Sequence, residues 1–475
     1  MDKSINEVIR TVPCQGESFS RFDTEFDSAQ ERLQTQQFAH KGITDDKENF
    51  IHQKELTSEE LQRLKQINDS YCQVIVGGKH QVVSTKPCPI EGTRLQFVSL
   101  KEFNNNFLHE SKIAKKFAGE SWVEWSGKNY KPDGLGFYPK LAQCPDSVYN
   151  LFPGFAGTSQ QGDVTPALTH IEKVLCAGDS KAAHYVLDWL AHIFQKPEEK
   201  CTVAILLKSV EGTGKGTLFR FIEPILGQLA VQTNGGYQIT GRFNSVMANR
   251  LLVFADEVDF TDSRTADKLK GLISEPRVSL ERKGIEPVQL PNLVRFIFAS
   301  NHTNVIRAGT RERRFVVLDP DSQFAQDKFY FDNLYRWIEG DGPNYFYHFL
   351  LNRDIRHFDP NRAPVTSALI EEKLASLSPY QAFIYEQLCR DRLFNGEVRL
   401  KPADIVQKCR NWCEDNHMPL STQSINSGIG RLFKQLGIPK QGRSGRNDYY
   451  ELPNIEDCKR RFAAMLGHLP EQIFD

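Results

Sequence analysis

Four short apolar runs in the middle of the chain constrain its fold more than any other feature of the sequence. They are residues 202–207 (TVAILL), 250–256 (RLLVFAD), 293–300 (LVRFIFAS) and 314–319 (RFVVLD). Each has the length of a strand and is nearly continuous in apolar residues, and helix-like segments separate them. Strands of this kind are typical of a parallel sheet with both faces covered by helices. The sequence therefore predicts an α/β core.

A glycine-rich segment, LKSVEGTGKGTL at 207–218, lies between the first of these runs and a helix-like stretch. Strand, glycine loop and helix is the context of a P-loop, in which backbone N–H groups and the helix N-terminus face phosphate oxygens. An ordinary turn is the alternative. For a P-loop we expect ATP to contact Glu211, Gly212, Thr213, Gly214, Lys215, Gly216, Thr217 and Leu218.

This loop departs from the usual pattern at two positions. Ser209 stands in place of the first glycine, and Gly216 follows the lysine where Ser or Thr is usual. Lys215 would neutralise the β- and γ-phosphates, and Thr217, one residue late, could supply the hydroxyl that binds Mg²⁺.

Polar residues end the next two apolar runs. Asp256 and Glu257 follow the second run, about 40 residues after Lys215, and Asn301 follows the third. Asp256 could hold Mg²⁺ through water, Glu257 could polarise the attacking water, and Asn301 could orient that water. The alternatives are solvated acids after a core strand and a simple turn residue.

An arginine cluster, RAGTRERRF, follows Asn301 and contains Arg307, Arg311, Arg313 and Arg314. Guanidinium groups at this point suit an arginine finger that reaches a neighbour's nucleotide. A solvated basic loop is the alternative.

The order of glycine loop, ADE strand, hairpin, strand with Asn301 and arginine cluster resembles superfamily 3 helicases, AAA+-type hexameric motors. The motifs EGTGKGT, ITGRFN, LLVFADE, LISEPRVSLERKG and RERRF more closely resemble phage and plasmid primase-helicase proteins. It extends from about residue 57 to the C-terminus and is strongest over 150–320. It implies ATP and Mg²⁺ as ligands, and a ring in which Arg313 or Arg314 acts on the next subunit.

The resemblance also implies a DNA contact at residues 277–290, whose pattern predicts a hairpin with Arg282 and Lys283 at its tip. In such helicases a hairpin here lines the pore and grips single-stranded DNA. An exposed, solubilising hairpin is the alternative. We expect a primase to be absent or supplied by a separate chain.

Three functions therefore stay open. The first is an ATP-dependent helicase acting on single-stranded and forked DNA in replication of a phage, plasmid or integrated element. The second is an initiator that uses ATP only to assemble on an origin. The third is an interaction module with a decayed site, against which the intact Lys215, Asp256 and Glu257 argue.

The flanking regions predict further units around an ATPase domain at 156–364. Residues 1–56 are polar and indicate a helical or partly disordered arm, and 57–155 indicate a small α+β domain that opens with a capping box, Thr57 to Glu60. A further helix should begin with Thr165 as its N-cap.

Residues 365–475 have the outline of a winged helix. Ser421 is expected to cap a helix, and Lys440, Arg443 and Arg446 crowd a glycine-containing wing that could contact duplex DNA; a protein-docking role is the alternative. Cys409, Cys413 and His417 are spaced four apart, which favours a half-buried helix over a metal site.

Composition limits the partners and the location of the protein. The formal net charge is −1 over 475 residues, so contacts to nucleic acid must come from local patches. Neither a signal-peptide core nor a run of about 18 apolar residues is present, so we expect a soluble cytoplasmic protein without a membrane partner.

Overall fold

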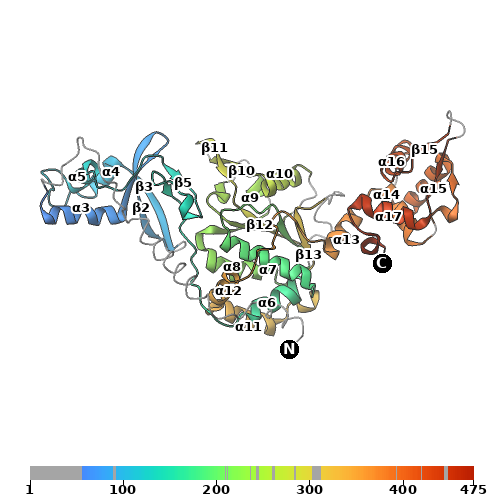
Figure 1. Cartoon of the computed structure of the whole chain (residues 1–475), viewed down its shortest axis with the longest axis horizontal. Coiled ribbons are helices and arrows are strands. Elements are labelled where there is room, and N and C mark those ends of the chain that lie inside the picture. Colours follow the sequence, from blue (N-terminus) through green and yellow to red (C-terminus); the bar gives the residue numbers. More distant parts are fainter. Residues whose placement is uncertain are drawn as a thin grey trace.

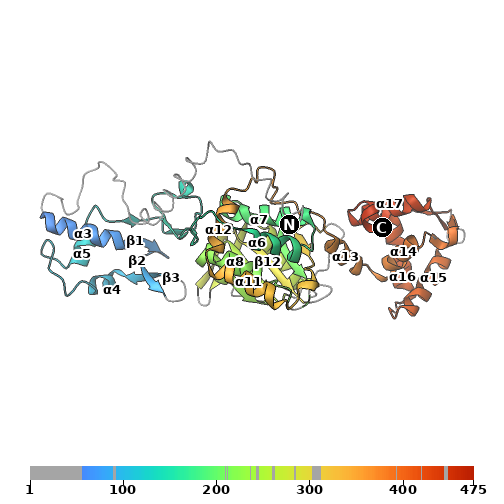
Figure 2. The ribbon, with the colours of Figure 1, turned by 90° about the horizontal axis from the view of Figure 1, so that it is seen from below.

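Three units follow one another along the chain and lie in a row, with the central unit between the N-terminal and C-terminal ones (Figures 1 and 2). The computed structural model describes residues 56–88, 92–208, 210, 212–235, 237–241, 245–258, 263–282, 285–301, 312–391, 393–418, 420–442 and 448–474. The arm expected at residues 1–56 thus lies, except for Leu56, outside the described residues.

The N-terminal unit begins with a capped helix that leads into a four-stranded sheet. Helix α3 (Ser58–Ser70) starts at the predicted capping box: Thr57 N–H donates to Glu60 Oε2 at 2.9 Å, and Glu60 N–H donates to Thr57 Oγ1 at 3.2 Å. The strand order is β3-β2-β1-β4. The other elements are β1 (Tyr71–Val76), β2 (Lys79–Cys88), β3 (Gly92–Ser99), α4 (Leu100–Asn105), α5 (Ala118–Glu124), β4 (Tyr130–Lys131), β5 (Leu135–Gly136) and β6 (Tyr149–Asn150).

The four apolar runs form strands of one five-stranded sheet in the central unit, and all of its pairings are parallel. Its order is β13-β7-β12-β9-β8. Ile297 pairs with both Ile205 and Phe254, so the carboxyl ends of β7, β12 and β9 meet at one edge. The bounds are β7 (Ala204–Lys208), β8 (Ala230–Asn234), β9 (Leu252–Asp256), β12 (Arg295–Ser300) and β13 (Phe315–Leu318).

Helices cover both faces of this sheet because its strands alternate between two apolar clusters. Ile205 and Leu207 pack with α7, α8 and α12, whereas Ala204 and Leu206 pack with α9, α10 and α13. The helices are α7 (Ser180–Gln195), α8 (Thr217–Leu226), α9 (Tyr237–Thr240), α10 (Ser263–Ser274), α11 (Lys328–Glu339), α12 (Gly342–Leu351) and α13 (Ser367–Ala375).

The start of helix α6 (Thr165–Thr169) corrects one prediction. The residue before the helix is Val164, and Thr165 is already its first residue rather than its N-cap. The Thr165 N–H donates to Asp163 Oδ1 at 2.9 Å, so an aspartate two residues upstream satisfies this amide instead. The helix continues as a π-helix, η3 (His170–Leu175).

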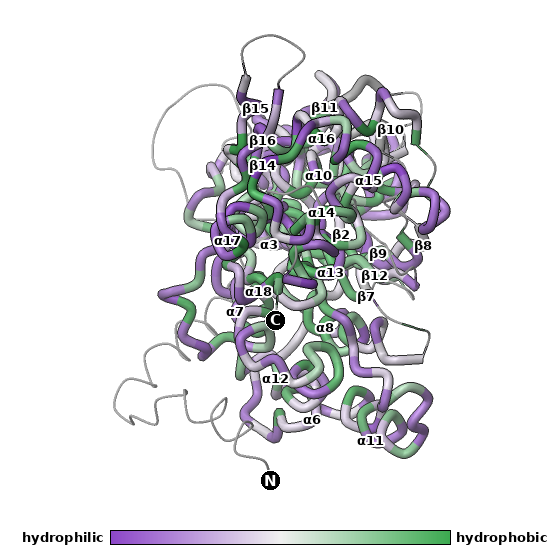
Figure 3. Tube along the Cα trace, turned by 90° about the vertical axis from the view of Figure 1, so that its right-hand side faces the viewer, coloured by the Kyte–Doolittle hydropathy of each residue, from purple (hydrophilic) through white to green (hydrophobic). Residues whose placement is uncertain are grey.

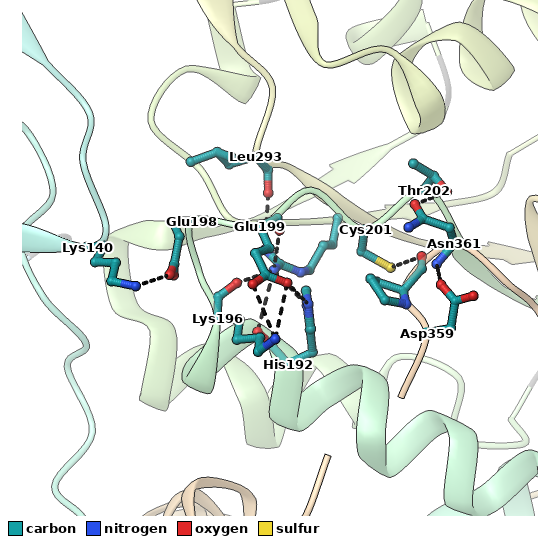
Figure 4. A network of polar contacts seen from close by, with 12 residues as sticks. Lys140, His192, Lys196, Glu198, Glu199, Cys201, Thr202, Leu293, Asp359 and Asn361 are labelled. Carbon is teal, nitrogen blue, oxygen red and sulfur yellow. Dashed lines mark hydrogen bonds and ion pairs between the residues drawn. The ribbon is translucent and has the colours of Figure 1, made fainter. Parts of the chain in front are cut away.

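A polar network joins the N-terminal unit to the central one (Figure 4). Lys140 forms an ion pair with Glu198 at 3.1 Å, just before β7. The Thr202 hydroxyl donates to Asn361 Oδ1 at 2.8 Å, which fastens the segment after α12 to the same place. Both contacts lie on the segment that leads into β7.

The C-terminal unit has its own apolar core and a small antiparallel sheet in the order β14-β16-β15. Ser421 caps α16 as predicted, since Ser424 N–H donates to its hydroxyl at 3.2 Å. The hydrophilic β15 lies at one end of this unit (Figure 3). The elements are α14 (Pro379–Cys389), β14 (Arg399–Leu400), α15 (Pro402–Asp415), α16 (Thr422–Gln435), β15 (Lys440–Gln441), β16 (Tyr449–Glu451), α17 (Ile455–Leu466) and α18 (Pro470–Ile473).

The cysteine pattern of α15 belongs to this core. Cys409 and Cys413 are buried in it, whereas His417 lies two residues beyond the end of the helix with a positive φ of 56°. The three side chains therefore do not continue one helical face. Within the described part of the chain, no helix has the length and apolar character needed to cross a bilayer.

Candidate functional site

The glycine-rich loop joins the carboxyl end of β7 to the first turn of α8. Gly214 has φ +84°, and a Cβ atom there would lie 2.7 Å from His170 Cε1 and 2.8 Å from Phe331 Cε1. Gly212 also has a positive φ, +83°. Gly216 has φ −71°, and a Cβ atom there would meet none of the described residues within 4 Å, so the geometry demands glycine at 214 and tolerates a side chain at 216. Ser209 and Glu211 lie outside the described residues.

Lys215 is held inside this loop, with 8% of the residue exposed. Its ammonium group donates to the Val210 carbonyl at 3.0 Å and to Asn301 Oδ1 at 2.5 Å. Asn301 follows β12, the neighbour of β7 in the sheet. Two residues that lie 86 positions apart in the sequence are thus in direct contact.

Thr217 opens α8 and is 3% exposed. Its N–H donates to the Gly214 carbonyl at 3.0 Å, and its hydroxyl lies 3.5 Å from that of Tyr335 on α11. The Arg220 guanidinium stacks over the Tyr335 ring at 5.0 Å. The adjacent Leu218 is fully buried, so its side chain belongs to the core and only its backbone can face a ligand.

Asp256 and Glu257 lie at the carboxyl end of β9, on the other side of β12 from the loop. Asp256 Oδ1 accepts from the Glu257 N–H at 3.0 Å, and the Asp256 carbonyl accepts from Gly235 N–H at 2.7 Å. Glu257 is exposed and has φ +53°, in the left-handed region that glutamate seldom adopts. The turn therefore places two successive carboxylates at the end of a strand.

Residues that the sequence did not single out complete the loop's surroundings. His170 Nε2 lies 3.2 Å from the Gly214 carbonyl, and Nδ1 lies 3.0 Å from the Tyr330 hydroxyl. Since a carbonyl can only accept, Nε2 carries a proton and Nδ1 of the neutral ring accepts from Tyr330. Burial lowers the pKa of His170 to about 4, which keeps the ring neutral. No local pattern announces these contacts, because they span 44 and 160 residues.

The two described arginines of the cluster lie at the opposite edge of the sheet. The Arg314 carbonyl accepts from Ala204 N–H, at the start of β7, at 2.7 Å. The five residues of β7 span about 16 Å, so Arg314 lies a strand length away from the loop of its own chain. Arg313 is exposed. The backbone N–H groups of Arg313 and Arg314 both donate to Glu312 Oε1. Arg307 and Arg311 lie outside the described residues.

The expected DNA contacts are partly described. Strands β10 (Arg277–Arg282) and β11 (Ile285–Pro291) form the predicted antiparallel hairpin, with an irregular register between Leu280 and Arg282. Lys283 is not among the described residues, nor is the side chain of Arg282.

In the C-terminal hairpin, Lys440 pairs in register with Tyr450 and forms an ion pair with Asp448, two residues before Tyr450 on the other arm. This hydrogen bond raises the pKa of Lys440. Arg443 and Arg446 lie outside the described residues.

Comparison with known proteins shows similarity to a phage protein. A model of a family of unknown function, DUF5906, matches residues 207–314, from the end of β7 to Arg314. A stretch of 164 residues is 26% identical to the DNA primase-polymerase of Nitratiruptor phage NrS-1. The chain is homologous to a phage replication protein. The match covers 34% of this chain but only 23% of the phage protein, so the chain spans less than a quarter of that relative.

Solved structures show the same fold. The apo structure of the NrS-1 C-terminal region has a TM-score of 0.57 and 15% identity, covering 83% of this chain and 99% of that one. Two A-form apo structures of this region give TM-scores of 0.60 and 0.61, again at 15% identity, and cover 82% and 83% of this chain and 97% and 99% of theirs. The sequence match to the phage protein confirms the expected relation to phage replication proteins, and these structures add the fold.

Proposed function

We propose that this chain is an ATP-driven DNA helicase of superfamily 3 type, with a P-loop ATPase core and a winged-helix C-terminal unit. The observation that carries the proposal is the contact between Lys215 and Asn301 at the edge where β7, β12 and β9 end. It joins a buried cation to an amide at the edge where the next strand, β9, ends in two carboxylates. Ligands of parallel α/β sheets bind at this edge.

The loop is built to hold phosphate groups. Gly212 and Gly214 have positive φ angles, and α8 begins directly behind the loop with its N-terminus, the end of a helix that favours anions. Lys215 now donates to two neutral oxygens, and it would exchange these for the more strongly accepting phosphate oxygens.

The oxygen donors fit a magnesium ion. Mg²⁺ favours one or two protein oxygens together with substrate phosphates and water. Asp256 offers a carboxylate. Thr217, the first residue of α8 and two residues after Lys215, offers a hydroxyl. When bound, the ion would neutralise charge on the phosphates. Among the residues that the structure describes, no group of three or more His, Cys, Asp and Glu side chains has the geometry of a metal site.

The geometry of the turn after β9 supports an acid–base role for Glu257. Its backbone is held in a costly left-handed conformation by Asp256 and by the Val258 N–H, which donates to Ala299 at 3.1 Å. Exposed and acceptor-only, Glu257 can take a proton from the attacking water, while Asn301 orients that water from the adjacent strand.

The position of the arginines supports a ring. Arg313 and Arg314 lie at the edge remote from the loop of their own chain, so a nucleotide that they contact must belong to a neighbouring subunit. Six such chains would form the hexamer, with the β10–β11 hairpin and its Arg282 and Lys283 facing single-stranded DNA in the pore.

Two variants test this function. Glu257→Gln should bind ATP as the wild type does but lose about 10²–10⁴-fold in turnover, because an amide cannot accept the proton. Lys215→Ala should weaken ATP binding itself. ATPase rates near the wild-type value in both would refute the site.

Unwinding distinguishes a motor from an initiator. We expect ATPase activity that rises with single-stranded DNA and persists while a forked duplex is opened. ATP-dependent assembly on duplex DNA without continued turnover would favour the initiator.

A further inference from the structure

Helix α13 belongs to two apolar cores at once. Ala368 and Leu369 are buried in the cluster that lies under β13 and α10, in the central unit. Ile370 and Leu374, on other faces of the same helix, pack against the core of the C-terminal unit. Figure 1 shows α13 between the two units. A nine-residue helix moves as a rigid piece, so displacement at one core is felt at the other.

A buried ion pair ties α13 to the glycine loop. Lys208, the last residue of β7, lies 2.9 Å from a carboxylate oxygen of Glu372, which is completely buried. The loop begins at the next residue after Lys208. Burial raises the pKa of Asp319, the residue after β13, while the charges of Lys208 and Lys215 lower it. Asp319 therefore lies close enough to both lysines to interact with them. A charge buried this deeply is costly to separate from its partner.

The next residue of α13 makes the corresponding contact with the C-terminal unit. Lys373 is 4% exposed, and its ammonium group donates to His468 Nε2 at 2.8 Å and to the Leu466 carbonyl at 3.0 Å. Leu466 ends α17, where the partial negative charge of the helix favours a cation. Consecutive residues point about 100° apart on a helix, so Glu372 and Lys373 reach different units from one place.

We propose that α13 couples the glycine loop to the C-terminal unit through these two adjacent buried charges. A shift of the loop alters the Lys208–Glu372 contact, moves α13, and changes how Lys373 holds the end of α17. The coupling is reciprocal, because any linkage between two sites works in both directions. It rests on the proposed function only in taking the loop to be the nucleotide site.

Hydrogen exchange of the full-length chain tests the coupling without any ligand. Glu372→Gln should speed amide exchange about tenfold at residues 463–473, in the C-terminal unit. Lys373→Met should do the same at residues 212–218, in the loop. The matched control is Glu371→Gln, because Glu371 is exposed on the same helix and should change neither segment.

A second variant guards against simple unfolding of α13. Lys208→Met combined with Glu372→Met removes both charges and leaves no uncompensated one in the interior. It should keep the melting temperature close to that of the wild type and still speed exchange at 463–473. Exchange that changes only beside each substitution, in this variant and in Lys373→Met, would overturn the proposal.

Titration of the wild type with Mg-ATP separates this proposal from the proposed function. Reciprocal exchange effects without ATP binding would leave the coupling standing and sink the nucleotide site. ATP binding with strictly local exchange effects would do the opposite. With both intact, ATP should alter exchange at 463–473, and Lys373→Met should remove at least about nine-tenths of that response.

Discussion

At the scale of single residues, the loop distinguishes its glycines sharply. Gly214 occupies a position that no other residue fits, since a Cβ atom would meet the rings of His170 and Phe331 and the φ angle is positive. Gly216, two residues on, has an ordinary φ angle and open space among the described residues. The position that looked anomalous in the sequence is thus sterically the permissive one.

We therefore expect Gly214→Ala and Gly216→Ala to differ. Gly214→Ala should cost about 1–3 kcal/mol of unfolding free energy and lower ATP affinity at least about tenfold, because the loop must shift. Gly216→Ala is the matched control and should stay within about 0.5 kcal/mol of the wild type. Chemical denaturation and ATP titration measure both quantities, and equal effects of the two substitutions would contradict this view of the loop.

His170 should make stability depend on pH. Its pKa is about 4 in the folded chain and 6.5 as the ordinary value, so between these values the unfolded chain binds more protons. Stability should fall as pH drops from 6.5 to 4, by on the order of 3 kcal/mol in full. His170→Gln should flatten this part of the profile. His192, also buried with a lowered pKa, is common to both proteins and cancels in the comparison.

At the scale of elements, the sequence predicts those helices and strands whose signals lie in residues close together along the chain. Apolar runs predicted the strands, and Thr57 with Glu60 and Ser421 predicted two helix starts, because each signal is local. The strand order does not follow from the runs, since continuous apolar strands fit many orders. The same applies to the site: Lys215 and Asn301 were foreseen, but not their contact.

Other site residues have no local signal at all. His170, Tyr330 and Tyr335 reach the loop only through tertiary packing, and aromatic residues on a helix are more often simple core. Thr165 is not the cap because the helix already includes it, and Asp163 accepts from its amide. Lys440 was predicted as a DNA contact in a basic stretch, and the structure adds an ion pair between it and Asp448 on the other arm of the hairpin.

The C-terminal hairpin offers a test at this scale. Replacing Lys440, Arg443 and Arg446 by alanine should weaken duplex DNA binding and reduce the slope of log affinity against log salt by about two to three units. Because Lys440 already pairs with Asp448, its share should be the smallest. The control is Arg460→Ala, an exposed cation of α17 in the same unit. An unchanged slope would favour protein docking by this unit.

At the scale of the whole molecule, the arginine position predicts complementation between subunits. A Lys215→Ala chain mixed equally with an Arg313→Ala, Arg314→Ala chain should regain about a quarter of wild-type ATPase activity, the chance that a random interface holds both intact groups. Each chain alone should be inactive. Rings confirmed by mass measurement but inactive at every mixing ratio would assign the arginines to their own subunit.

The separation of Arg314 from Lys215 by the length of a strand also bears on how the protein behaves when scarce. Under the proposed function, a solitary chain would carry halves of two different nucleotide sites and would complete neither. The rate of ATP hydrolysis per chain should then rise steeply with protein concentration and vanish on dilution. The amount of protein would therefore determine when hydrolysis begins. A phage or other element encoding such a protein would use no ATP for unwinding until enough protein chains were present to assemble around DNA.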